Sequence, residues 1–220
     1  MSTSAASPSR ENGRLGAYVL RNRRTLIHAA QRILATEGAS ASIKAFADGA
    51  GMSVGSIYQH FGNKEGLIEA ALIDALAEWN RWISSVIADV DDDFERLVTP
   101  MRLLIRLSST HPDIAALFAN CSDVITKLFV NFEPAEPYEI IGALVAAGRI
   151  PDDDVHLRTR TVLFSIAMLA LVRFRSGDLD DIEADRSIGF ILGILGISQT
   201  EATRLSTLPL PVDGLDPSNR

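Results

Sequence analysis

The sequence predicts an all-α protein in which an N-terminal three-helix module with a helix-turn-helix precedes a larger helical domain. Apolar residues recur at intervals of three and four, and no segment alternates convincingly with the period of two typical of a β-strand. Residues 1–64 carry a net positive charge, whereas the rest of the chain is acidic. We expect a flexible arm over residues 1–18, the helix-turn-helix domain over 19–68, a helical domain over 69–204 and a flexible tail over 205–220.

Composition narrows the class of protein. With 220 residues, 47% hydrophobic and 22% charged, the chain can bury a sizeable core. The single cysteine, Cys121, excludes an internal disulfide and a multi-cysteine zinc site, and it indicates a cytoplasmic protein. The longest apolar run, residues 162–172, is shorter than the roughly 20 residues that span a bilayer, so we expect no membrane partner. Three aspartate clusters precede predicted helices, where the helix dipole favours them, and we expect neither metal nor cofactor.

The formal net charge of −7 hides an asymmetry. Residues 1–64 carry eight basic and three acidic residues, a balance of +5, whereas the remainder carries 13 basic and 25 acidic residues, a balance of −12. An acidic surface is repelled by duplex DNA, so the total argues against a nucleic-acid partner only if the chain is one body. A basic module joined to an acidic one removes that objection.

Three short amphipathic helices are predicted near the N-terminus. The first starts near Asn22 and ends at Gly38, which suits the left-handed position after a helix. Ser42 and Ser53 can cap two further helices of about two turns each, separated by Gly51. Because helices this short are unstable alone, the first helix must cover them. Two such helices joined by a tight glycine-containing turn are typical of a helix-turn-helix.

A long fourth helix, capped by Asn63 and ending near Asp89, leads into further helices. We expect these at roughly 94–110, 113–132 with a break, 136–147, 154–176 and 182–197. The run at 162–172 is apolar on all sides, as in a helix that is buried all round. Glycines at 189, 193 and 196 fall on one narrow face of the last helix.

Residues 27–72 carry a pattern that runs in order over several of these elements. It comprises Ala29-Ala30, Gly38, Phe46-Ala47, Ala50-Gly51-Met52-Ser53, Ile57-Tyr58, Phe61, Lys64-Glu65 and Leu67. This pattern resembles the DNA-binding domain of the TetR family of bacterial transcriptional regulators. Two residues depart from it: Phe46, where Ile is usual, and Gly49 inside the second helix. The resemblance implies an all-helical homodimer with an N-terminal reader of double-stranded DNA and a divergent C-terminal domain for a small-molecule effector.

The third helix offers the candidate DNA-reading surface. Val54, Ile57 and Phe61 form its apolar side, which leaves short polar groups for base edges in the major groove. Gln59 suits adenine and Ser56 several bases, and the resemblance implies a sugar-phosphate contact for Tyr58. The candidate DNA-binding residues are Ser42, Lys44, Ser53, Val54, Gly55, Ser56, Tyr58, Gln59, His60 and Lys64.

Basic residues around the third helix have two interpretations each. Lys64 lies in the first turn of the fourth helix, where a cation opposes the dipole, so we expect a phosphate there, as the resemblance also implies. Lys44 either touches phosphate or is solvated, and Ser42 either bonds phosphate or only caps its helix. Arg10 and Arg14 on the predicted arm either reach the minor groove or add nonspecific affinity.

The C-terminal domain carries weaker signals, and for each the alternative is plain packing within one subunit. Candidate pocket residues, which suggest a mostly apolar ligand, are Trp79, Trp82, Met101, Ile105, Phe118, Cys121, Phe129, Phe164 and Met168. Two helices from each subunit are expected to form a four-helix dimer interface. Its candidate residues are Phe164, Met168, Leu171, Gly189, Leu192, Gly193 and Gly196.

These features predict a sequence-specific regulator, a repressor that its ligand releases from a palindromic operator. The alternative is a DNA-binding dimer without a small effector, whose C-terminal domain only dimerises or binds a protein. A filled interior would favour the alternative, whereas a cavity on the order of a few hundred Å³ would favour the effector. The sequence has no Gly-rich phosphate loop, His-x-x-x-His pair or G-x-S-x-G motif, so we expect no enzymatic activity.

Overall fold

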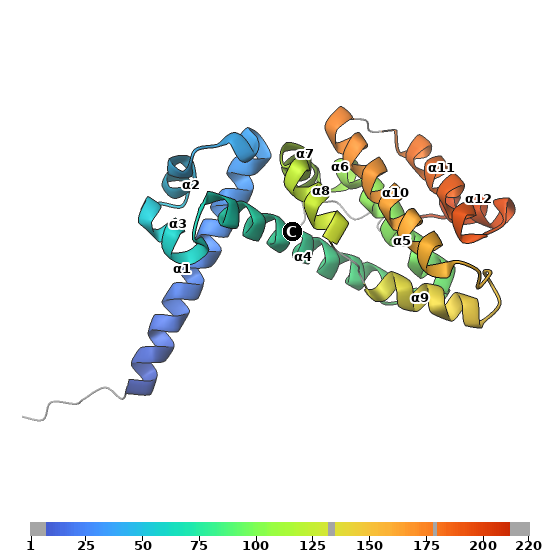
Figure 1. Cartoon of the computed structure of the whole chain (residues 1–220), viewed down its shortest axis with the longest axis horizontal. Coiled ribbons are helices and arrows are strands. Elements are labelled where there is room, and N and C mark those ends of the chain that lie inside the picture. Colours follow the sequence, from blue (N-terminus) through green and yellow to red (C-terminus); the bar gives the residue numbers. More distant parts are fainter. Residues whose placement is uncertain (1–7, 132–134, 178–179, 212–220) are drawn as a thin grey trace, which may run out of the picture. The chain divides into compact units, whose positions relative to one another are not determined.

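The computed structural model describes residues 8–131, 135–177 and 180–211, and within these ranges every regular element is a helix (Figure 1). The chain divides into two compact units, Met1–Ala75 and Leu76–Arg220. The division falls inside α4 (Lys64–Ile87), a few residues after the boundary expected at residue 68. Helix α4 therefore contributes residues to both units.

The first unit is built around α1. Its elements are α1 (Pro8–Glu37), the 3₁₀ turn η1 (Gly38–Ser40), α2 (Ile43–Gly49), α3 (Val54–Phe61) and the start of α4. Leu26, Ala30 and Leu34 of α1 are fully buried, as are Phe46 of α2 and Ile57 of α3. Helix α1 contacts α2, and α2 contacts α3. Helix α1 therefore covers α2 directly, and α3 packs against α2, so neither short helix stands alone.

Three of the predicted N-terminal helix caps of this unit, Ser42, Ser53 and Asn63, are confirmed. The side-chain oxygens of Ser42, Ser53 and Asn63 each accept a hydrogen bond from the backbone N–H three residues later, at 3.1, 3.3 and 2.7 Å. Gly38 and Gly51 have φ values of +69° and +65°, which glycine adopts without steric cost. Local sequence therefore fixes the ends of α1, α2 and α3.

Two segments expected to be flexible are ordered, and those expectations are wrong. Helix α1 begins at Pro8, so residues 8–18 are helical and the start expected near Asn22 is too late. Adding residues to a helix already anchored by packing costs little once the nucleus exists, which the capping argument ignored. The expected tail over 205–220 overlaps α12 (Gln199–Thr207), a helix that sequence patterning missed, and Leu205 and Leu210 are buried. Residues 1–7 and 212–220 lie outside the described part.

The second unit surrounds one central helix. Its further elements are α5 (Asp93–Ile105), α6 (Leu107–Thr110), α7 (Pro112–Asn120), α8 (Ser122–Asn131), α9 (Ala135–Ala146), α10 (Val155–Ser176), α11 (Asp181–Leu192) and η2 (Gly193–Leu195). Helix α10 contacts each of α5 to α9 and α11. By length and composition alone α10 could cross a membrane, but it contacts six other α-helices of the unit. Phe164 and Val172 are exposed, so the expectation that residues 162–172 are buried all round is wrong.

Two expectations for the last helices are wrong. Helix α11 ends at Leu192, because Gly193 starts η2 and Gly196 has a φ of +80°. The three glycines at 189, 193 and 196 therefore do not share one helical face. A Cβ on Gly196 would lie 2.6 Å from Pro151 Cδ, so this glycine serves a close approach within the chain.

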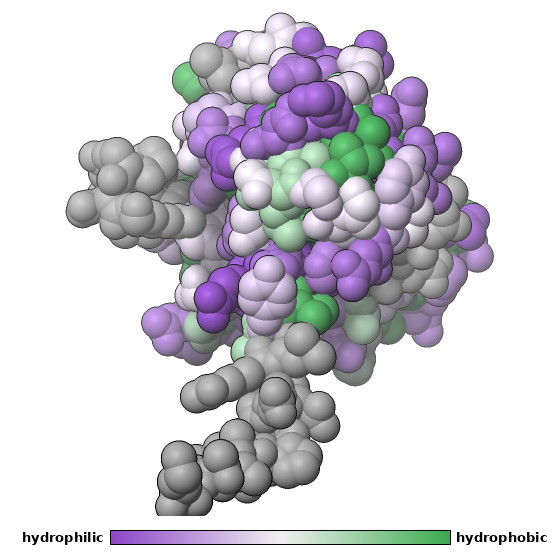
Figure 2. Space-filling model, turned by 90° about the vertical axis from the view of Figure 1, so that its left-hand side faces the viewer, coloured by the Kyte–Doolittle hydropathy of each residue, from purple (hydrophilic) through white to green (hydrophobic). Residues whose placement is uncertain are grey.

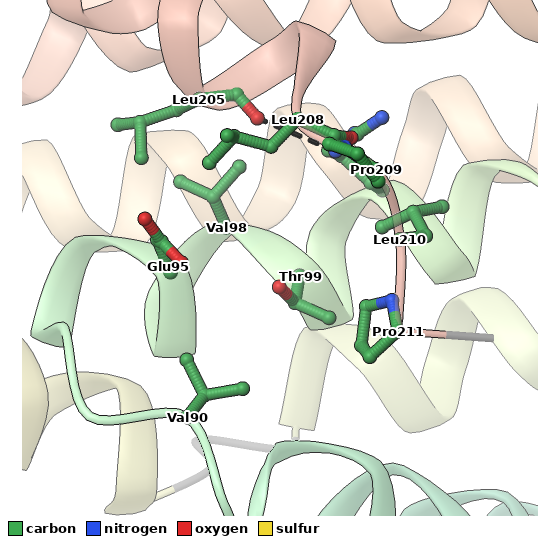
Figure 3. A pocket seen from close by; sticks show the side chains of 10 residues that line it. Val90, Glu95, Val98, Thr99, Leu205, Leu208, Pro209, Leu210 and Pro211 are labelled. Carbon is green, nitrogen blue, oxygen red and sulfur yellow. Dashed lines mark hydrogen bonds between the residues drawn. The ribbon is translucent and has the colours of Figure 1, made fainter. Parts of the chain in front are cut away.

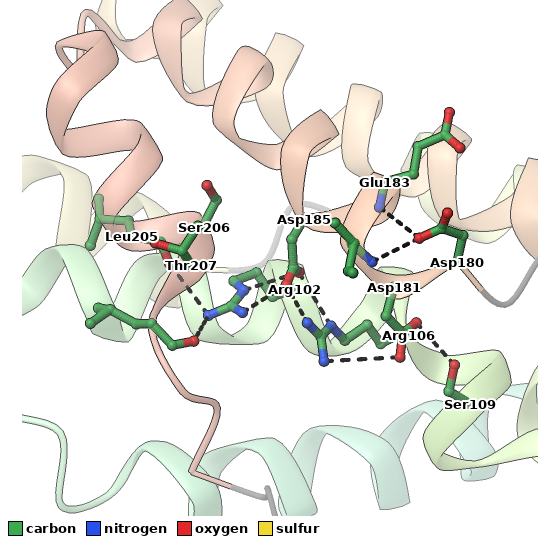
Figure 4. Close-up of polar contacts among 12 residues, drawn as sticks. Arg102, Arg106, Ser109, Asp180, Asp181, Glu183, Asp185, Leu205, Ser206 and Thr207 are labelled. Carbon is green, nitrogen blue, oxygen red and sulfur yellow. Dashed lines mark hydrogen bonds and ion pairs between the residues drawn. The ribbon is translucent and has the colours of Figure 1, made fainter.

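A buried charge network ties α5, α11 and the C-terminal segment together (Figure 4). Asp185 accepts hydrogen bonds from Arg102 Nη2 at 2.8 Å and Nε at 3.1 Å, and also from Arg106. Arg102 Nη1 donates to the carbonyl oxygens of Leu208 at 2.6 Å and Leu205 at 3.4 Å. Arg102 and Asp185 are only 4% and 7% exposed. Arg102 therefore holds the end of α12 and the segment after it against α5.

Candidate nucleic-acid interface

Helix α3 presents one side to solvent. Ile57 is fully buried and sets the rotation of the helix, so Gly55, Tyr58 and Gln59 are exposed, Tyr58 by 55%. Val54, Ser56 and His60 are half-buried. Figure 2 shows the side of the first unit that carries α2 and α3, where hydrophilic residues predominate and hydrophobic ones form small separate spots.

The other candidate DNA-binding residues lie at the starts of α2, α3 and α4. Ser42, Lys44 and Ser53 are exposed, and Lys64 is half-buried. Lys44 Nζ lies 2.5 Å from Asp48 Oδ2, which partly neutralises its charge. Ser53 Oγ lies 3.1 Å from Ser56 Oγ in addition to capping α3. All ten residues therefore lie in one continuous segment of the first unit, and none is fully buried.

Lys64 has a structural role that sequence reasoning missed. Its ammonium donates hydrogen bonds to the carbonyl oxygens of Ala39 at 2.9 Å and Ala41 at 3.0 Å. These bonds fix the turn between α1 and α2 against the start of α4. No local pattern could have indicated them, because the acceptors are backbone atoms 23 and 25 residues away. An ammonium has three N–H donors, so one remains for a phosphate.

Gly49, the departure from the family pattern, has a packing reason. A Cβ at this position would lie 2.7 Å from Ile33 Cδ1 of α1. At the same place Arg32 Nη2 donates to the Gly49 carbonyl at 3.2 Å. The glycine therefore allows α1 and α2 to approach closely, which offsets its lower helix propensity.

The candidate pocket residues are mostly core residues. Trp79, Met101, Ile105, Phe118 and Cys121 are buried, whereas Trp82 and Met168 are half-buried. Phe164 is 49% exposed, so it does not face the interior of this chain, and the side chain of Phe129 lies outside the described residues. Burial raises the pKa of the Cys121 thiol to about 11, as expected of an inert core cysteine.

Aromatic rings fill part of this interior. The Trp79 and Trp82 ring centroids are 4.9 Å apart, and the His111 ring lies edge-on at 5.3 and 4.6 Å from them. Phe118 and Phe174 lie 6.2 Å apart. These distances are those of ordinary aromatic packing.

A small cleft occurs elsewhere in the second unit (Figure 3). Its volume is about 210 Å³, and it lies between the start of α5 and the segment after α12. It is lined by Val90, Glu95, Val98, Thr99, Arg102, Leu205, Leu208, Pro209, Leu210 and Pro211. None of these is a candidate pocket residue, and Arg102, the only cation among them, already bonds Asp185 and two carbonyls.

The candidate dimer residues divide into two groups. Phe164, Gly193 and Gly196 are exposed and Met168 is half-buried, whereas Leu171, Gly189 and Leu192 are buried within the chain. A Cβ on Gly189 would lie 3.4 Å from Ser206 Oγ of α12. For Gly189 this agrees with the alternative, packing inside one subunit.

Two aspartate clusters contribute helix caps. Asp92 accepts from the Glu95 amide at the start of α5, and Asp180 accepts from the Ile182 and Glu183 amides at the start of α11. Among the described residues, no group of three His, Cys, Asp or Glu side chains could hold a metal ion.

The fold and its exposed reading helix define a helix-turn-helix DNA-binding protein. Residues 26–71 match the family described as bacterial regulatory proteins, tetR family. This segment of the chain therefore resembles the DNA-binding domain of that family, and the chain as a whole is similar to transcriptional regulators.

Relatives agree with this assignment. The "Uncharacterized HTH-type transcriptional regulator Rv1255c" of Mycobacterium tuberculosis is 28% identical over 160 residues, which cover 71% of this chain and 77% of the relative. RolR in complex with the ligand resorcinol shares the fold with a TM-score of 0.72 and 21% identity, covering 89% of this chain and 98% of RolR. The fatty acid degradation regulator FadR from Bacillus halodurans has a TM-score of 0.59 and 16% identity, covering 87% and 97%.

Proposed function

We propose that this chain is a sequence-specific, DNA-binding homodimer of the cytoplasm that represses transcription and catalyses no reaction. It leaves a palindromic operator when a small, mostly apolar effector binds. The observation that carries DNA binding is the exposed side of α3, with Gly55, Tyr58 and Gln59 outward and Ile57 inward. Such a helix fits the major groove. Gln59 would pair with adenine, Ser56 would bond neighbouring bases, and Tyr58 would contact the backbone.

Homodimerisation is supported by exposed apolar side chains on α10 and α11. In the described part of the second unit, all exposed large hydrophobic residues belong to these two helices: Leu157, Phe164, Val172, Ile182 and Phe190. Those on α10 are spaced seven and eight residues apart and those on α11 eight apart, so each set lies on one face. The helices also contact each other. An apolar surface of this kind is typical of a protein interface.

An effector in the second unit would act through α4, which supplies residues to both units. The effector can shift the spacing of the two readers only by binding one arrangement more tightly than the other. The structural likeness to RolR, solved with resorcinol, supports a small effector. Phe118 is fully buried and its ring centroid lies 6.2 Å from that of Phe174, and this packing supports the second candidate, a DNA-binding dimer without a small effector.

The test is selection of duplexes from a random pool by the full chain, with and without small aromatic and aliphatic molecules. Gln59→Ala should relax the preference at its base pair by about 1–3 kcal/mol, whereas the exposed Gln199→Ala on α12 should change nothing. Tyr58→Ala should weaken binding to every duplex. Lys64→Ala is a poor probe, because it also removes two bonds that hold the turn before α2.

Three outcomes would contradict parts of the proposal. An unenriched pool, or an unchanged preference in Gln59→Ala, would reject α3 as the reader. A wild-type monomer at micromolar concentration in sedimentation would reject the dimer, whereas Phe164→Glu with Phe190→Glu should dissociate it. If no small molecule releases the selected duplex, the candidate without an effector stands.

A further inference from the structure

Helix α1 carries a line of basic side chains on its solvent side. Arg21, Arg24, His28 and Arg32 are all exposed and follow one another at intervals of three, four and four residues. Residues at these intervals lie on one face of a helix. We call these four residues the α1 basic stripe. Buried Leu26 and Ala30 stand two positions before and after His28, on the opposite side.

The stripe continues toward the N-terminus by helical register. Positions 10 and 14, both arginine, are four residues apart, and position 14 is seven residues before position 21. Over its 30 residues α1 has six arginines and two glutamates, a balance of +4. In the part of the chain that the structure describes, neither Arg21 nor Arg24 pairs with a carboxylate. Their charge is therefore available to an outside anion.

The stripe extends past the end of the reading helix. The Arg23 guanidinium lies 5.0 Å from the centre of the Phe61 ring, and Phe61 is the last residue of α3. Residue 23 thus marks where α1 passes α3, and residues 8–22 project beyond it by about 22 Å at 1.5 Å per residue. Figure 1 shows α1 continuing for several turns past α3. Arg32, at the other end of the stripe, bonds the Gly49 carbonyl at the end of α2.

We propose that the α1 basic stripe binds the phosphate backbone of the duplex beside the base pairs that α3 reads. The proposal rests on the proposed DNA-binding function and adds a second contact surface to it. Successive stripe residues rise about 4.5–6 Å along the helix, a spacing suited to a row of backbone phosphates. Arg21 and Arg24 precede residue 26, where the family match begins, so they extend the interface beyond the shared module.

The test compares variants of adjacent arginines in the full chain. The double variant Arg21→Gln and Arg24→Gln removes two stripe charges, whereas Arg23→Gln removes a charge that faces Phe61 instead. Affinity is measured over a range of salt on the duplex selected by the wild type and on a scrambled duplex of equal composition. The slope of log affinity against log salt is negative, and each lost phosphate contact should reduce its magnitude by about 0.9.

For two contacts per protomer, the magnitude of the slope for a dimer should fall by about 3.6, and affinity should drop by about tenfold or more, by the same factor on both duplexes. Arg23→Gln should leave the slope unchanged, and Arg21→Lys with Arg24→Lys should restore it. Thermal unfolding controls for folding. If the double variant has the same salt slope as Arg23→Gln, the α1 basic stripe does not bind phosphate. If Tyr58→Ala still loses selective binding in that case, the proposed DNA-binding function stands. A wild type that binds no duplex overturns the proposed function and the stripe with it.

Discussion

The two units of the chain place their important residues by different means. In the first unit, the candidate DNA-binding residues occupy positions 42–64, and each helix cap bonds an amide three residues away. In the second unit, Arg102 bonds Asp185, 83 positions later, and Leu208, 106 positions later. The helix starts in the candidate DNA-binding segment are therefore set by local caps, whereas the buried charge network of the second unit joins distant segments.

This difference has an energetic side. The ion pair of the reading region, Lys44 with Asp48, is exposed and joins neighbouring turns of one helix. The pair of Arg102 with Asp185 is buried and joins α5 to α11. Exposed pairs contribute little to stability, whereas removing one partner of a buried pair leaves an uncompensated charge. Stability of the second unit should depend on a few residues far more than that of the first.

The strongest way to break this comparison is Asp185→Asn. The variant keeps the shape of the side chain but removes the carboxylate charge that buried Arg102 pairs with, whereas Arg106 keeps its ion pair with Asp181. It should therefore lower the free energy of unfolding by about 3–5 kcal/mol. Urea unfolding followed by tryptophan fluorescence reports on the second unit, because both tryptophans, Trp79 and Trp82, belong to it.

The matched control is Asp48→Asn in the first unit, which removes the exposed carboxylate beside Lys44. Its effect should stay below about 1 kcal/mol in unfolding followed by circular dichroism. If Asp185→Asn costs no more than Asp48→Asn, the buried network does not hold the second unit together.

A smaller effect is expected at Gly66 in the first turn of α4. A Cβ there would lie 2.4 Å from the Phe61 carbonyl oxygen, a backbone atom that cannot move away cheaply. Gly66→Ala should therefore lower stability by about 1–3 kcal/mol in thermal unfolding. Gly142 in α9 has no heavy atom within 4 Å of such a Cβ, so Gly142→Ala should raise stability by up to about 1 kcal/mol. Equal effects at the two glycines would show that local packing around α3 is looser than these contacts indicate.

The sequence allowed a nearly complete prediction of the first unit for physical reasons. Capping residues act three positions away, and the alternation of buried Ile57 with exposed Gly55 and Gln59 follows helical periodicity. The sequence could not predict hydrogen bonds between residues far apart along the chain, such as those from Lys64 to the carbonyl oxygens before α2. The length of α1 was also misjudged, because caps mark possible helix starts but not how far a packed helix extends.

The second unit was predicted less well because its outcome depends on which segments meet. Apolar spacing predicts most of the helices, but Gly189 packs against α12, part of which the sequence predicts to be a tail. Phe164 looked like a core residue by composition, although it is half exposed on α10. Apolar patterning identifies a buried side but not the element, or the second subunit, that covers it.

The smallest effect is expected for an exposed ion pair of the second unit. It tests whether the cost of losing a carboxylate depends on its burial or only on the unit to which it belongs. Glu201 accepts hydrogen bonds from Arg204 at 2.8 and 3.0 Å, and these hold the pKa of Glu201 below its ordinary value of 4.5. A lowered folded-state pKa contributes stability above the ordinary value, and that contribution is lost as pH falls through the folded-state pKa. Glu201→Gln should therefore be less stable than the wild type near neutral pH, by less than about 1 kcal/mol, and the difference should vanish as pH falls below 4.5. Urea midpoints from tryptophan fluorescence at several pH values measure it. A loss as large as that of Asp185→Asn, or one independent of pH, would mean that membership of the second unit, and not burial, sets the cost.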